Sequence, residues 1–169
     1  MFDQIGNLPL HPLVVHLVVV GVPLAALLAF LFAFPRTREW ARWPLAITVV
    51  GVTVMTYVAR QSGLALEAAL GVTPGNPVGE LVLQHSLLGN QLFYIMIVFA
   101  GIGLLNVFVV RRSPPDSAHA AKQPAIIRIV LPVLMLAVAV VAVMWIVRVG
   151  DLGARAVWNP TAPPLFNFP

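Results

Sequence analysis

The sequence predicts an all-α protein, a four-helix transmembrane bundle. Hydrophobic residues make up 60% of the 169-residue chain and charged residues only 9%, whereas about 25% of the residues of a soluble domain are charged. Sixteen charged side chains, 10 basic and 6 acidic, are too few to cover four buried helices in water. Four uncharged stretches also approach or exceed the roughly 17–25 residues that cross a bilayer as a helix. They are residues 13–34, 43–59, 92–110 and 129–147.

We expect one integral membrane domain over residues 1–169, and local signals justify each of its elements. Pro12 suits the first turn of the first helix, where its missing N–H costs nothing. The second span needs Trp40 and Ala41 to reach sufficient length, with Arg42 extending to the interface. A turn cluster at 73–77 precedes the third span, and a proline-containing loop at 113–124 precedes the fourth. The expected spans are about 12–34, 40–60, 79–111 and 126–149.

Two further segments are expected at the outer face. Residues 64–70 predict a short interfacial helix between spans 2 and 3, because apolar residues recur at helical spacing. Residues 157–169 predict an extended outer tail, because their prolines prevent a regular helix. Both segments therefore lie outside the hydrocarbon in the expected structure.

The distribution of basic residues predicts the orientation in the membrane. Most of them lie between spans 1 and 2 or between spans 3 and 4, so the positive-inside rule places both loops in the cytoplasm and both termini outside. The net charge of +4 thus reflects topology, and the expected partner is the lipid bilayer, with no nucleic acid. The absence of cysteine excludes disulfides, iron–sulfur ligation and covalently attached haem. The basic loop residues are Arg36, Arg38, Arg42, Arg111, Arg112, Lys122 and Arg128.

The histidines at the outer face predict a cofactor site. His16 and His85 lie at comparable depths on neighbouring spans, His16 being about 7 Å into its helix at the usual helical rise. Two imidazoles in this relation are what a b-type haem or another histidine-ligated metal requires. Gly89, one turn after His85, leaves room for a flat macrocycle or for a close helix contact. Arg60 and Arg148 on the same face would pair with haem propionates or an anionic lipid.

Two more residues complete the candidate metal-binding set with His16 and His85. His11 precedes His16 by five residues, so the two side chains point about 140° apart on a helix, and His11 is expected to support the site or cap the helix. Asp151 either forms a local ion pair with Arg155 or supports the histidines. A structural hydrogen bond is the alternative role for each histidine of the set.

Three motifs resemble the DUF2231 family of small bacterial four-span membrane proteins. The first is Leu-Pro-Leu-His-Pro-Leu-Val-Val-His at 8–16, the second is His-Ser-Leu-Leu-Gly at 85–89, and the third is Gly-Asp-Leu-Gly-Ala at 150–154. The resemblance implies the fold and a bacterial plasma membrane. Some relatives resemble fusions to a Rieske iron–sulfur domain, which implies membrane redox chemistry by association. Several relatives carry histidine where this chain has Asp151, so a site lined only by histidine is not expected here.

The favoured function is a small multi-pass redox, electron-transfer or accessory protein that binds haem b or a metal at its outer face. It would exchange electrons with quinol or with other membrane redox proteins, and it is not expected to transform a substrate alone. The alternative is a structural accessory subunit of a larger respiratory or transport complex without a cofactor. A transporter is disfavoured, because no span carries an acid at mid-depth and no broken-helix pair is evident.

Overall fold

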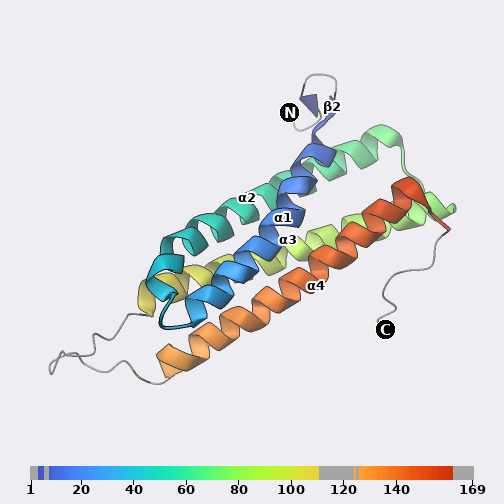
Figure 1. The fold of residues 1–169 in the computed structure, drawn as a ribbon. Coiled ribbons are helices and arrows are strands. Elements are labelled where there is room, and N and C mark those ends of the chain that lie inside the picture. The colour runs from blue at the N-terminus through green and yellow to red at the C-terminus, as the bar shows by residue number, and fades with distance from the viewer. Residues whose placement is uncertain (1–3, 6–7, 111–123, 125, 162–169) are drawn as a thin grey trace, which may run out of the picture.

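The computed structural model describes residues 4–5, 8–110, 124 and 126–161, and four long helices dominate it (Figure 1). Before the first helix, β1 (Gln4–Ile5) pairs antiparallel with β2 (Leu8–Pro9). The predicted all-α class with four membrane-length helices is confirmed. The helices are α1 (Leu10–Ala33), α2 (Arg38–Leu70), α3 (Pro77–Val109) and α4 (Leu131–Trp158), and the π-helical turn η1 (Ile126–Val130) leads into α4.

The helices form a closed antiparallel bundle in chain order. Each packs mainly on its two neighbours, α1 on α2 and α4, and α3 on the same two helices. Helices α1 and α3 therefore lie diagonally across the bundle, and their side chains meet at its centre. The first residue of α1 and the last residue of α4 lie at the same end of the bundle (Figure 1). The side of the membrane that this end faces stays a prediction.

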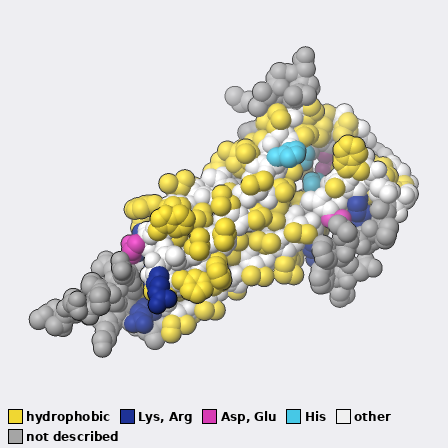
Figure 2. Space-filling view, viewed as in Figure 1, with side chains coloured by type: hydrophobic (Ala, Val, Ile, Leu, Met, Phe, Trp, Pro, Cys, Tyr) yellow, Lys and Arg dark blue, Asp and Glu magenta, His cyan; other side chains and the backbone are white. Residues whose placement is uncertain are grey.

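The outer surface of the bundle is as apolar as its core. Val22, Phe32 and Met96 are fully buried, while Val20, Ile47 and Phe108 are 69%, 72% and 63% exposed. Figure 2 shows hydrophobic side chains along the whole length of the bundle and charged ones gathered near its two ends. A monomer in water does not expose apolar surface on this scale, so lipid must cover it. The chain is a multi-pass membrane protein.

Helices α2 and α3 are longer than a bilayer needs. Each has 33 residues, or about 50 Å, against a hydrocarbon core of about 30 Å. On α2 the basic residues Arg42 and Arg60 are about 27 Å apart, which matches that core. With the hydrocarbon core placed between these two arginines, the last part of α2, beyond Arg60, would extend about 15 Å past it. Residues 64–70 belong to this extension, so the structure has a continuous α2 where the sequence predicted a separate interfacial helix.

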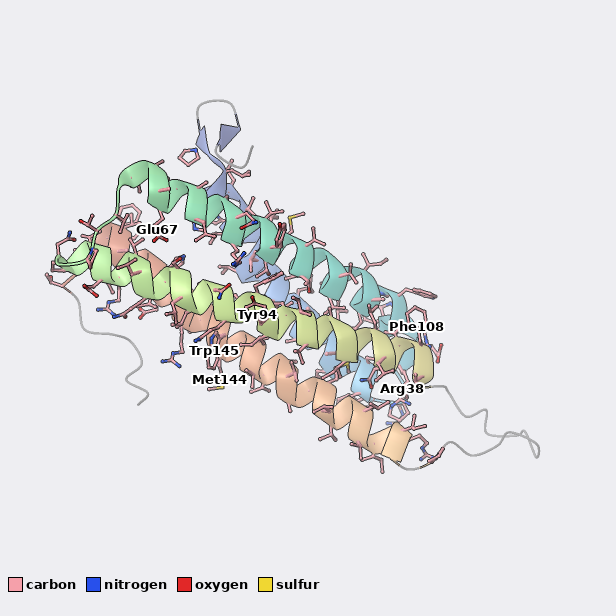
Figure 3. All side chains as sticks on the ribbon, turned by 180° about the vertical axis from the view of Figure 1, so that it is seen from behind. Arg38, Glu67, Tyr94, Phe108, Met144 and Trp145 are labelled. Carbon is pink, nitrogen blue, oxygen red and sulfur yellow. The ribbon has the colours of Figure 1, made fainter. Side chains whose placement is uncertain are left out.

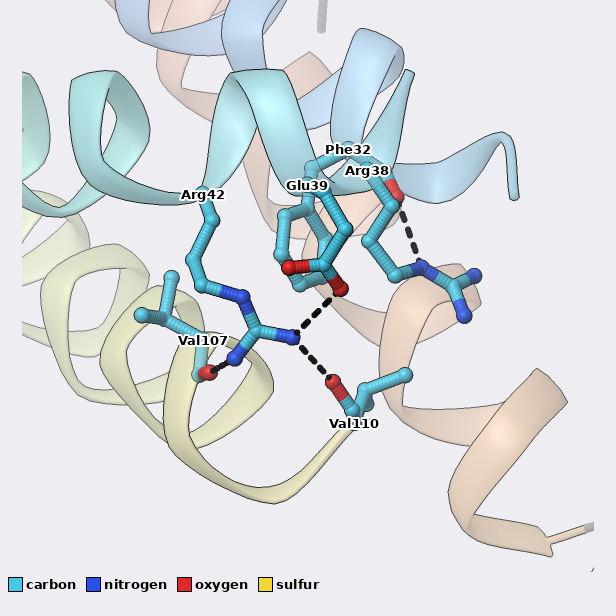
Figure 4. Close-up of polar contacts among 6 residues, drawn as sticks. All are labelled: Phe32, Arg38, Glu39, Arg42, Val107 and Val110. Atoms are coloured by element: carbon cyan, nitrogen blue, oxygen red, sulfur yellow. Dashed lines mark hydrogen bonds and ion pairs between the residues drawn. The ribbon is translucent and has the colours of Figure 1, made fainter. Parts of the chain in front are cut away.

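At the opposite end of the bundle, two arginines form hydrogen bonds with backbone carbonyls at the ends of other helices (Figure 4). Buried Arg38 donates from Nε to the Phe32 carbonyl at 3.1 Å. Arg42 donates from Nη1 to the Val107 carbonyl and from Nη2 to the Val110 carbonyl, the latter at 2.9 Å. The last carbonyls of a helix have no partner within the helix and carry partial negative charge. The guanidinium groups supply these partners and so join the ends of α1, α2 and α3.

The turn between α2 and α3 is fixed by local backbone chemistry. Gly71 ends α2 with a left-handed φ of 59°, which favours glycine. Asn76 caps α3, its side-chain oxygen accepting a hydrogen bond from the Gly79 N–H at 2.8 Å. A Cβ on Gly79 would lie only 2.2 Å from the carbonyl oxygen of Thr73. Only glycine fits at this position.

The expected tail and the second basic loop are largely outside the described residues. Val157 and Trp158 are the last residues of α4, so helix replaces the expected extended chain there. Residues 162–169 lie outside the described part of the chain, as do Arg111, Arg112 and Lys122. The first basic loop is described; Arg36 lies in the turn before α2, and Arg38 is the first residue of α2.

A histidine pair at one end of the bundle

Two imidazoles meet across the bundle at the end where the chain begins. His11 lies in the first turn of α1 and His85 lies in the third turn of α3. Their ring centroids are 6.0 Å apart and their planes are perpendicular. Both side chains are half-buried. Because α1 and α3 are diagonal helices, the pair lies at the centre of the bundle.

Each ring is oriented by a backbone carbonyl of the neighbouring helix. His11 Nδ1 is 2.9 Å from the Ala59 carbonyl oxygen on α2, and His85 Nδ1 is 2.8 Å from the Val149 carbonyl oxygen on α4. A carbonyl oxygen only accepts, so Nδ1 carries the hydrogen and donates it. In the neutral ring Nε2 then holds a lone pair. Among the described residues neither Nε2 has a hydrogen-bond partner.

A glycine lies against each ring, one helical turn beyond the carbonyl. A Cβ on Gly63 would lie 3.0 Å from Cε1 of His11, and a Cβ on Gly153 would lie 3.0 Å from Cε1 of His85. In both halves of the chain, therefore, one helix supplies the histidine and the next supplies a carbonyl and, four residues later, a glycine. The first half uses Ala59 and Gly63, and the second uses Val149 and Gly153. The rings fit only because these positions lack side chains.

The register of α1 decides which of its histidines enters the bundle. Buried Val14, Val18 and Val22 form the inward stripe of α1, and His11 continues that stripe at spacings of three and seven residues. His16 lies on the opposite face and is exposed, its Nδ1 2.5 Å from the Pro12 carbonyl oxygen of its own helix. The structure therefore pairs His11 with His85, where the sequence analysis expected His16.

An acidic residue lies just outside the pair. Glu67 follows Gly63 by one turn on the same face of α2, in the part that extends beyond the hydrocarbon. Its carboxylate is half-buried, and Figure 3 shows the side chain directed toward the ends of the neighbouring helices. The sequence analysis missed Glu67 and Gly63, and it quoted Gly153 within the 150–154 motif without giving it a role. The four-residue spacing from Gly63 to Glu67 was the available signal for Glu67.

The two predicted anion partners have other contacts. Arg60 donates from Nε to the Asn90 side-chain oxygen at 2.7 Å and lies over the Phe93 ring. Arg148 lies over the Trp145 ring at 5.5 Å. Both arginines are held at the helix surface near the pair.

Two predicted site residues remain, Asp151 and Gly89. Asp151 forms an ion pair with Arg155 at 3.8 Å, and among the described residues it has no hydrogen bond to either histidine of the pair. A Cβ on Gly89 would have nothing within 4 Å, so no close helix contact is made there, and its role beside a cofactor stays a prediction. No group of three or more His, Cys, Asp or Glu side chains that could hold a metal ion occurs within the described residues.

A family comparison agrees with this architecture. The model of the family described as "Predicted membrane protein (DUF2231)" matches residues 7–162. The chain belongs to this family. The DUF2231 match includes both histidines of the pair, both residues whose carbonyls accept their hydrogen bonds, and both glycines. No curated protein and no solved structure matches the chain.

Proposed function

We propose that this DUF2231 protein binds haem b between His11 and His85 and serves as a small electron-transfer or accessory component of a bacterial plasma membrane. The observation that supports the proposal is the histidine pair itself. Each ring is fixed through Nδ1 by a backbone carbonyl, as metal-ligating histidines commonly are. Nε2 of each ring is left to ligate iron.

The spacing of the rings fits a shared ion. A metal–imidazole bond is about 2 Å long, so imidazoles on opposite sides of one ion have centres about 6 Å apart. The centroids of His11 and His85 are 6.0 Å apart. Small residues let groups on neighbouring helices approach closely; Gly63 and Gly153 lie against the two rings, and the space beside Gly89 is open.

The donor set favours haem over a metal held by side chains alone. Structural and catalytic zinc sites use three or four protein ligands, and no such cluster exists among the described residues. Haem supplies four nitrogens of its own and needs only axial ligands from the protein. A pair of imidazoles without further donors is therefore sufficient for haem and insufficient for zinc.

The chain's own residues would perform three tasks around the cofactor. His11 and His85 would bind the iron, and the Ala59 and Val149 carbonyls would hold their orientation and raise their basicity. The apolar helices would exclude water, while Glu67 would place negative charge near the outer edge of the site. The bound haem would supply one-electron redox chemistry. Electrons would pass to quinol or another membrane redox protein, or be received from it.

The test is the visible spectrum of full-length protein expressed in bacteria with haem supplementation. We expect a Soret band with a bis-histidine reduced spectrum, lost in His11→Ala and in His85→Ala. His16→Ala is the matched control, because this residue lies on the same helix and points away from the pair. It should keep the full band.

Two results would overturn the proposal. A protein that stays colourless when haem is supplied would leave the accessory-subunit alternative. A Soret band that survives in His11→Ala but disappears in His16→Ala would mean that the ligand set predicted from the sequence is correct and the pair is not.

A further inference from the structure

A connected set of polar and aromatic side chains lies on the bilayer-facing side of α2 and α3, beside the histidine pair. We call it the α2–α3 cluster and define it as Tyr57, Arg60, Gln61, Asn90, Phe93 and Tyr94. Arg60 Nε donates to Asn90 Oδ1 at 2.7 Å, Arg60 Nη1 donates to Gln61 Oε1 at 3.3 Å, and Gln61 Nε2 donates to the Tyr57 hydroxyl at 3.1 Å. The network thus joins both helices.

Three aromatic rings accompany this network. Phe93 lies between Tyr57 and Tyr94, with ring centroids 5.6 Å away on each side. Tyr57 is 40% and Tyr94 is 58% exposed, so both rings are accessible at the surface of the bundle (Figure 3 labels Tyr94 on α3). Exposed aromatic faces offer stacking contact to another ring.

The cluster is next to the histidine pair along both helices. Arg60 directly follows Ala59, whose carbonyl orients His11. Asn90 follows Gly89, which lies one turn from His85 and has nothing within 4 Å of its Cβ position. A molecule held by the cluster would therefore lie close to the pair with no side chain at position 89 between them.

The remaining donors fit a neutral carbonyl better than a phosphate. Phosphate binding by arginine typically uses two parallel N–H groups of a free guanidinium. Arg60 commits its single Nε–H to Asn90 and one of its two Nη1–H groups to Gln61, so the parallel Nε–H and Nη–H pair is taken. One Nη1–H and both Nη2–H groups remain. The Tyr57 hydroxyl accepts from Gln61, and its own hydrogen has no acceptor among the described residues. Two separate donors beside aromatic rings match a ring that carries carbonyl oxygens.

We propose that the α2–α3 cluster binds the head group of a membrane quinone, with the ring against Tyr57 and Tyr94 and a carbonyl oxygen accepting from Arg60 or Tyr57. A quinone reaches this site from within the bilayer, where its isoprenoid tail remains. This binding goes beyond the proposed haem site and does not require it.

The test is photolabelling of full-length protein in nanodiscs of neutral phospholipid with an azidoquinone, competed by decylubiquinone. We expect saturable labelling of the cluster segments of α2 and α3. Arg60→Gln should raise the half-saturation concentration about tenfold and Tyr57→Phe about fivefold, as expected for loss of a charged and a neutral hydrogen bond. Arg148→Gln should leave it unchanged, because that arginine lies over Trp145 on α4.

Three outcomes would overturn the quinone proposal. The first is labelling that no added lipid or quinone competes. The second is labelling that neither Arg60→Gln nor Tyr57→Phe changes. The third is labelling that phosphatidylglycerol displaces and decylubiquinone does not. Tyr57→Phe keeps the ring and therefore tests the site even if Arg60→Gln fails to fold. The Soret band is measured separately, so loss of the haem proposal and loss of the quinone proposal are distinguishable.

Discussion

Replacing Gly63 by alanine tests whether the glycine next to His11 is required by the histidine pair. The new Cβ would lie 3.0 Å from Cε1 and 3.1 Å from Nδ1 of His11, which is closer than ordinary van der Waals contact. The ring has little freedom to retreat, because the Ala59 carbonyl holds its Nδ1 at 2.9 Å and His85 lies beside it. The substitution must therefore stretch that hydrogen bond or shift a helix.

The magnitude follows from three opposing terms. Alanine in place of glycine stabilises a helix by up to about 1 kcal/mol. Overpacking costs about 1–3 kcal/mol, and a weakened hydrogen bond costs up to about 1.5 kcal/mol. We therefore expect Gly63→Ala to lower the free energy of unfolding by about 1–2 kcal/mol. Gly101→Ala is the matched control, because its Cβ position has nothing within 4 Å and lies on the exposed side of α3.

The assay is reversible denaturation in mixed micelles, followed by far-ultraviolet circular dichroism. Gly101→Ala should be as stable as the unmodified protein or up to about 1 kcal/mol more stable, and Gly63→Ala should be less stable than both. Equal stability of the two alanine variants, with the Soret band of the proposed haem site also unchanged, would refute the claim that the His11 ring is confined between the two helices.

Two further predictions concern the ends of the helices. Arg42→Gln should lower the free energy of unfolding by about 1–3 kcal/mol, because the Val107 and Val110 carbonyls lose a charged donor. The same denaturation assay checks this. An unchanged denaturation midpoint would contradict a stabilising role for the Arg42 hydrogen bonds. Gly79→Ala should cost about 2–4 kcal/mol, since its Cβ would lie 2.2 Å from the Thr73 backbone oxygen. The yield of folded protein on size-exclusion chromatography measures this loss, and a full yield would show that the turn before α3 can rearrange.

Much of the fold could be predicted because it depends on local properties of the chain. Each span was visible as a charge-free stretch, and the described helices contain those stretches except for one or two residues at an end of α1, α3 and α4. The ends of the helices were less predictable. Residues 64–70 have the pattern of an interfacial helix, yet α2 continues through them to Leu70, because nothing between Arg60 and Gly71 interrupts backbone hydrogen bonding.

The candidate site was only partly predictable. His85 was expected in the site, whereas His11 was assigned a supporting role. Helical periodicity places His11 and His16 on different faces of α1, but it does not say which face meets α3. The spacing to Val14, Val18 and Val22 could have favoured His11, since those valines form one stripe, but α1 is apolar on every side and the stripe does not stand out.

The sequence by itself determined that this chain has four helices long and apolar enough to cross a bilayer, since span length and hydropathy are properties of contiguous residues. Only the tertiary structure decided that His11 and His85 face one another, each beside a carbonyl and a glycine from a third and a fourth helix. The physical reason is that these contacts join residues 48 and 64 positions apart, and such contacts depend on the rotation of each helix in the bundle. In an almost uniformly apolar chain, packing sets that rotation and local pattern does not reveal it.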